Sequence, residues 1–168
     1  MFDLPPFFDM SYIGSGELVL RVFLAMLFGF LLGLDRDTKN KPIDFRAFII
    51  VAVTTCIIAI MGQELYVDLS KGEDVVAPID LAKLIAGALT GIGFLGAGAI
   101  IHRGEAQVIG TATGASIWAS GGIGLALGFG FYGLALIAFV AIAITLVGGG
   151  YYMKFFHGKK DKESVPDE

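Results

Sequence analysis

Long apolar runs alternate with short polar segments along the whole chain. A helix that crosses a membrane needs about 20 predominantly apolar residues, and five runs approach that length. The last two lie within one uncharged stretch that we divide near the Gly-Phe-Gly-Phe sequence at 128–131. The expected spans are about 17–34, 47–65, 81–101, 106–128 and 131–150. The pattern therefore predicts an all-α, polytopic membrane protein, a bundle of about five transmembrane helices.

The two ends of the chain differ from this pattern. Residues 1–16 mix Phe and Asp with a Pro pair, which is typical of a segment at the membrane interface. The first run is not expected to be a cleaved signal peptide, because no Lys or Arg precedes Arg21. We therefore expect an interfacial segment over 1–16, a transmembrane domain over 17–153 and a charged cytoplasmic tail over 154–168.

The composition supports lipid as the solvent. Of the 168 residues 55% are hydrophobic, and the mean hydropathy is +0.76. This is too apolar for an ordinary soluble domain, so we expect the bilayer, and no nucleic acid, as a partner. The single cysteine, Cys56, excludes an intramolecular disulfide.

The positions of the positive charges predict the orientation, because cytoplasmic loops collect Lys and Arg. With five crossings, most basic residues fall on one side of the membrane, which gives an outside N-terminus and a cytoplasmic C-terminus. This basic side holds Arg36, Lys39, Lys41, Arg46, Arg103, Lys154, Lys159, Lys160 and Lys162. The opposite side has an acidic loop with Glu64, Asp68, Glu73, Asp74 and Asp80.

Glycines recur at a spacing of four inside the runs. Such pairs let membrane helices approach closely, and they occur at Gly29/Gly33, Gly87/Gly91, Gly110/Gly114 and Gly124/Gly128. The third run also holds a G-x-G-x-x-G, but the strand and downstream acidic residue of a dinucleotide site are not evident around it. We assign Gly87, Gly91, Gly93, Gly96 and Gly98 to helix packing; a broken helix lining a pathway is the alternative.

Polar residues concentrate in the fourth run, at Thr111, Thr113, Ser116, Trp118 and Ser120. The hydroxyl groups are expected to bond within their own helix or to a neighbouring helix. A polar pathway through the bundle is the alternative interpretation.

Ionisable side chains mark both ends of the first run. Glu17 and Arg21 lie four residues apart and could pair, but both are near the end of the run, so we favour anchoring at the interface by snorkelling. At the other end, Asp35, Arg36 and Asp37 could meet Arg46 in a polar network at the cytoplasmic mouth. A solvated turn explains the same spacing equally well.

A metal site is not defined by any motif. The acidic outer loop offers oxygen atoms, which Mg²⁺ prefers, but acidic loops are common without a metal. We therefore expect no resident cofactor, and weigh Mg²⁺ only as an ion that the loop could attract.

Three ordered motifs resemble the MgtC/SapB family of bacterial inner-membrane proteins. Gly33-Leu34-Asp35-Arg36-Asp37 is similar to its G-x-E-R-E/D type motif, and the stretch 91–98, GIGFLGAG, is similar to its most recognisable signature. Arg103-Gly104 followed by 110–118, GTATGASIW, resembles its R-G-L-x-T-A-A-S-x-W segment. The resemblance implies a five-span inner-membrane protein linked to growth in low magnesium and, in some pathogens, to virulence. It is closest to the short form without the C-terminal soluble domain.

Two functions remain open at this point. The first is a non-catalytic bundle that modulates ion homeostasis by binding a membrane partner. The second is an ion transporter or channel subunit, for Mg²⁺ or another ion, which would need a homo-oligomer because five short helices are few for a private pore. An enzyme is not expected, because no nucleophile or metal-ligand constellation is evident in the sequence.

Overall fold

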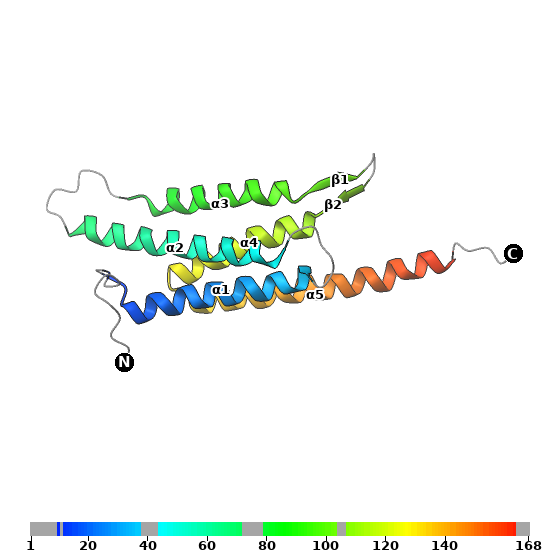
Figure 1. Ribbon diagram of the computed structural model, residues 1–168, viewed down its shortest axis with the longest axis horizontal. Helices are drawn as coiled ribbons and strands as arrows, with labels where there is room; N and C mark the ends of the chain where they lie inside the picture. The colour runs from blue at the N-terminus through cyan, green and yellow to red at the C-terminus, as the bar shows by residue number, and fades with distance from the viewer. Residues whose placement is uncertain (1–9, 11, 38–43, 72–78, 104–106, 164–168) are drawn as a thin grey trace.

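The computed structural model describes residues 10, 12–37, 44–71, 79–103 and 107–163. They form five helices and one short hairpin, in the order α1 (Ser15–Asp37), α2 (Phe45–Ser70), α3 (Leu81–Gly98), β1 (Ile101–Arg103), β2 (Gln107–Ile109), α4 (Thr111–Gly128) and α5 (Tyr132–Glu163). The helices lie side by side along one direction (Figure 1). The all-α prediction is confirmed.

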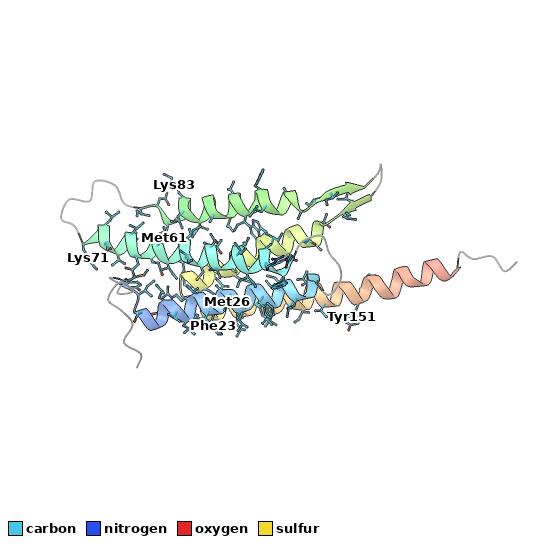
Figure 2. The ribbon with its side chains drawn as sticks, viewed as in Figure 1. Phe23, Met26, Met61, Lys71, Lys83 and Tyr151 are labelled. Atoms are coloured by element: carbon cyan, nitrogen blue, oxygen red, sulfur yellow. The ribbon has the colours of Figure 1, made fainter. Side chains whose placement is uncertain are left out.

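Four of the helices are long and apolar enough to cross a membrane. They are Ser15–Leu34 of α1, Phe45–Ser70, Leu81–Gly98 and Tyr132–Tyr152 of α5. Large apolar side chains such as Phe23 and Met26 lie on the outer side of α1 (Figure 2). A protein in water rarely exposes so much apolar surface, so these faces fit a hydrocarbon environment.

The remaining helix, α4, lies in the middle of the bundle. It contacts α1, α2, α3 and α5, and 11 of its 18 residues are buried. Because α4 faces protein rather than lipid, it can carry Gly, Ser and Thr at positions where the outer helices carry large apolar residues. The fourth expected span, about 106–128, is therefore a helix, but one that the other helices surround.

Glycines bring α4 against its neighbours. A Cβ atom at Gly124 would collide with the backbone oxygen of Ala52 on α2, and one at Gly114 would collide with the backbone of Gly96 on α3. The α1–α2 contact uses the same device, because a Cβ atom at Gly29 would lie 2.8 Å from the oxygen of Phe48. Backbones that approach this closely gain van der Waals contact that lipid cannot provide.

The boundaries of the third and fourth spans differ from those expected. Helix α3 ends at Gly98. Strands β1 and β2 follow as an antiparallel hairpin, in which Ile101 pairs with Ile109. Ile101 and residues 107–109, which were expected in helices, are therefore in strands. Helix α4 begins only at Thr111, because its N-cap Gly110 has φ 92°. The loop between these spans was expected at 102–105, but the β-branched residues Ile100, Ile101, Val108 and Ile109 beside it fit a strand as well as a helix. Hydropathy alone therefore did not show where each helix ends.

The other helices are longer than the predicted spans. Helix α2 runs to Ser70, so Glu64 and Asp68, which we expected in the acidic loop, are helical. Helix α5 continues to Glu163 through most of the expected tail, because Lys and Glu are good helix formers. The expected interfacial segment falls mostly on residues 1–9 and 11, outside the described residues.

We call the two ends of the bundle the Glu64 end and the Phe45 end. The Glu64 end holds the start of α1, the end of α2, the start of α3 and the α4–α5 turn. The Phe45 end holds the end of α1, the start of α2, the β1–β2 hairpin and the start of α4. In Figure 1 the Glu64 end is on the left.

Candidate functional site

A buried cation, Arg21, lies at the Glu64 end, about a turn and a half into α1. Its side chain is only 6% exposed. Nη2 donates to Glu17 Oε1 at 2.5 Å, and Nη1 donates to Gln63 Oε1 at 2.8 Å and to the backbone oxygen of Gly128 at 2.5 Å. The snorkelling interpretation is therefore wrong for Arg21, and the alternative pairing with Glu17 is correct. The guanidinium group joins α1, α2 and the end of α4.

Tyr132 completes this polar cluster from the start of α5. Its hydroxyl accepts a hydrogen bond from Arg21 Nε at 3.3 Å and donates to Glu17 Oε1 at 3.3 Å. Glu17 thus receives hydrogen bonds from its own helix and from α5. We call Glu17, Arg21, Gln63 and Tyr132 the Arg21 cluster.

The Arg21 cluster satisfies the carbonyl groups at the C-terminus of α4. This helix ends in a Schellman motif, in which Phe131 N donates to Ala126 O at 2.8 Å and Gly130 N donates to Leu127 O at 3.0 Å. Two further oxygens are bonded by side chains: Gly128 O by Arg21, and Phe129 O by Gln63 Nε2 at 3.3 Å. Backbone groups inside a membrane protein must find such partners, so α1 and α2 together close the end of α4.

Gly130 is the residue that makes this turn possible. Its φ of 79° lies in the left-handed region, and a Cβ atom there would lie 2.9 Å from Arg21 Nη2. Both the turn and the guanidinium group therefore need glycine at this position.

A buried carboxylate lies close by, on α2. Glu64 Oε1 accepts from the backbone N–H of Ile13 at 2.7 Å, and both of its oxygens accept from that of Tyr12 at 3.2 Å. The Ile13 side chain is itself buried. Glu64 thus fixes the residues that precede α1 onto the end of the bundle.

Sequence reasoning missed most of this site. Gln63 and Glu64 interrupt an otherwise apolar run, and polar residues inside a span are candidates for function by default. That signal was present, but the sequence does not reveal which residues of α4 and α5 meet them.

The structure describes only part of the predicted polar network at the Phe45 end. Asp35, Arg36 and Asp37 form the end of α1, but their side chains lie outside the described residues, as does that of Arg103 in β1. Arg46 pairs with Asp44, the N-cap residue of α2. The hydrogen bond from the Arg46 side chain holds the pKa of Asp44 below its ordinary value. Both side chains are solvent-accessible, and Asp44 is the N-cap residue. The pair therefore acts at the surface, as a cap at the start of α2.

The glycines of the predicted small-residue surface of α3 do not all contact a neighbouring helix. Gly96 packs against Gly114 of α4, whereas a Cβ atom at Gly87, Gly91, Gly93 or Gly98 would meet nothing within 4 Å. These four glycines therefore do not pack against another described helix within one chain.

The predicted polar residues of α4 are also placed differently from one another. Thr113 and Ser116 are buried, and Ser116 Oγ donates to Ala112 O of its own helix at 2.6 Å. Thr111 is exposed, and Trp118 is 48% exposed. Ser120, another of these polar residues, makes a bond to a neighbouring helix as expected: its Oγ donates to Phe48 O of α2 at 2.8 Å.

Metal ligands do not cluster in the part of the chain that is described. No group of three or more His, Cys, Asp or Glu side chains there could hold a metal ion.

Comparison with known proteins gives a consistent family. The model of the MgtC family matches residues 22–154. Protein SapB of Bacillus subtilis is 32% identical over 82% of this chain and 58% of its own length. Protein MgtC of Salmonella typhimurium is 31% identical over 74% of this chain and 48% of its own. YhiD of Escherichia coli, described as a candidate magnesium transporter, is 26% identical over 79% of this chain and 60% of its own.

The chain thus spans about half to three fifths of the length of these curated relatives. No solved structure matches it. The match to this family and the four apolar helices described above indicate a multi-pass protein of the bacterial inner membrane. From the family match over most of its length, we conclude that this chain belongs to the MgtC family.

Proposed function

We propose that this protein acts in ion homeostasis, with magnesium as the ion, by binding another membrane protein. The role in magnesium homeostasis is suggested by relatives, of which one is described as a candidate magnesium transporter. The proposal further places the N-terminus outside and the C-terminus in the cytoplasm, with the Glu64 end of the bundle facing outward.

One observation carries the partner-binding part of the proposal: the exposed outer side of α3. Only 11% of this span is buried in the bundle. A Cβ atom at Gly93 would meet no atom of the described residues within 4 Å, and Phe94 is 81% exposed. An aromatic side chain beside a glycine offers a transmembrane partner both a large contact and a close backbone approach.

Site-specific crosslinking tests this proposal. A photoreactive phenylalanine analogue is placed at Phe94 on α3 and, as a control, at Ile137 on α5, which is 70% exposed. We expect one membrane protein to crosslink at position 94 and not at position 137. Deleting that partner should remove the effect of this chain on growth in low magnesium. Equal labelling at both positions would contradict the assignment of the α3 surface.

Transport by an oligomer is the second candidate, favoured by the description of the E. coli relative. In this version Asp35 and Asp37 would lie at the inner mouth, with the Gly and Thr residues of α3 and α4 along the pathway. Proteoliposomes with an internal Mg²⁺ indicator distinguish the two functions. Mg²⁺ uptake that is lost in Asp35→Asn but retained in Asp68→Asn would support transport. Absence of Mg²⁺ uptake by the wild-type protein would support partner binding.

The orientation is tested by single-cysteine labelling in a Cys56→Ala background. We expect cysteines at Gly16 and Ser70 to react with a membrane-impermeant maleimide in intact cells, and one at Tyr151 to react only after permeabilisation. Labelling at Gly16 and Tyr151 from the same face would contradict the proposed topology.

A further inference from the structure

An apolar groove runs between α2 and α3. It has a volume of about 490 Å³, and its walls include Ile50 and Ile58 of α2 and Leu84 and Leu95 of α3. The groove exists because Gly87 and Gly91 leave the α3 wall without side chains. Ile50 and Leu95 are half or more exposed, so the groove is open along its side. In the membrane, this opening faces the lipid chains.

A charged pair stands at one end of the groove. Lys83, in the first turn of α3, lines the groove, and its Nζ lies 3.7 Å from Asp80 Oδ2. The other carboxylate oxygen of Asp80 accepts from the backbone N–H groups of Ala82 at 3.0 Å and Lys83 at 3.2 Å. The carboxylate is thus held in place by the helix cap, while the Lys83 side chain is 85% exposed.

The position of this pair matches the headgroup region of a bilayer. Helix α3 has 18 residues, which gives a length of about 27 Å at 1.5 Å per residue. That is close to the thickness of the hydrocarbon core, about 30 Å. Lys83 lies at the start of α3 (Figure 2) and Asp80 is its N-cap residue. A helix of this length that spans the hydrocarbon core would bring the pair to the boundary between acyl chains and headgroups.

The combination of groove and charges selects a class of lipid. An acyl chain fits the apolar walls, and the adjacent cation and anion are complementary to a headgroup that carries both a phosphate and an ammonium group. A purely anionic headgroup would be repelled by Asp80, and a choline group has no N–H to donate to a carboxylate. We propose that the α2–α3 groove binds one phosphatidylethanolamine molecule, with its phosphate on Lys83, its ammonium on Asp80 and one acyl chain along Gly87 and Gly91. This inference does not depend on the proposed function.

Native mass spectrometry of the delipidated full chain tests the proposal. The protein in mild detergent is titrated separately with phosphatidylethanolamine, phosphatidylglycerol and phosphatidylcholine of identical acyl chains. We expect one bound molecule, with phosphatidylethanolamine preferred by about tenfold, as expected for one charge-assisted hydrogen bond.

The chain offers a matched control for the charged pair. Lys71 and Asp68 form an equally spaced pair at 3.6 Å, but neither lines the groove. Lys83→Gln should lower the affinity for phosphatidylethanolamine by about tenfold and remove the headgroup preference, whereas Lys71→Gln should change neither. Both side chains are exposed, so both variants should fold. Gly91→Leu, which fills the groove, should abolish binding of all three lipids.

Three results would overturn the proposal. They are equal affinity for the three lipids, a stronger affinity for phosphatidylglycerol, and the same loss of affinity in Lys71→Gln as in Lys83→Gln. If Gly91→Leu does not fold, the comparison of the two lysine variants decides alone.

Discussion

Arg21 Nη1 donates to the backbone oxygen of Gly128 at 2.5 Å, so a cation on α1 closes the last turn of α4. A helix C-terminus carries partial negative charge and unpaired carbonyl groups, and both favour a cation there. In water such carbonyls can be hydrated. Inside a bundle surrounded by lipid they depend on side chains, and this gives Arg21 its importance for the fold.

Replacing Arg21 by methionine should destabilise the bundle strongly. The change keeps an unbranched side chain but leaves the Gly128 carbonyl without its side-chain donor and the Glu17 carboxylate with the Tyr132 hydroxyl alone of the donors described above. We expect a loss of about 3 kcal/mol in the free energy of unfolding, measured by thermal denaturation in mild detergent. Lys71→Met removes an exposed ion pair and should cost less than about 1 kcal/mol; a similar loss in both variants would argue against the capping role.

Gly130→Ala should destabilise the α4–α5 turn. The left-handed φ and the close approach of Arg21 Nη2 both disfavour a Cβ atom, so we expect a loss of about 2 kcal/mol or more. Gly133, three residues further on in α5, has nothing within 4 Å of its Cβ position, and Gly133→Ala should stabilise the helix by about 0.5–1 kcal/mol. The two variants should therefore shift the melting temperature in opposite directions.

Glu64→Gln should loosen the segment before α1. A neutral amide oxygen accepts more weakly than a carboxylate, so the backbone N–H groups of Tyr12 and Ile13 should exchange with solvent about tenfold faster. Hydrogen–deuterium exchange of the N-terminal peptide measures this, with Asp68→Asn as the control for loss of one carboxylate on α2. Unchanged exchange in Glu64→Gln would mean that burial of Ile13, and not Glu64, holds the segment.

The sequence predicts the helices of this fold well and its polar contacts poorly. Apolar runs reveal where helices lie because the lipid imposes their length and composition. They reveal less about the chain near 99–110, where β-branched residues suit either a helix or the strands that are present. They also made α4 look like its neighbours, although its Gly and Ser content marks the buried helix.

The candidate site could be anticipated only in part. The spacing of four between Glu17 and Arg21 predicts that they can pair, since it lies within one helix. The spacing shows how far along the helix the two residues lie, but not whether their side chains face the bundle or the lipid. Snorkelling was therefore also compatible with the sequence. The contacts with Gly128 and Tyr132 depend on how distant helices pack, which local spacing does not determine.

The fold depends on α4 as the central helix, held by backbone contact at its glycines. The most direct measurement compares Gly124→Ala with Gly122→Ala, two changes on the same helix, by thermal unfolding in mild detergent. A Cβ atom at Gly124 would collide with Ala52 and Thr55 of α2, whereas one at Gly122 would meet nothing within 4 Å. We predict that Gly124→Ala lowers the free energy of unfolding by about 2 kcal/mol or more, while Gly122→Ala leaves it unchanged or raises it by up to about 1 kcal/mol. Equal stability of the two variants would contradict the central position of α4.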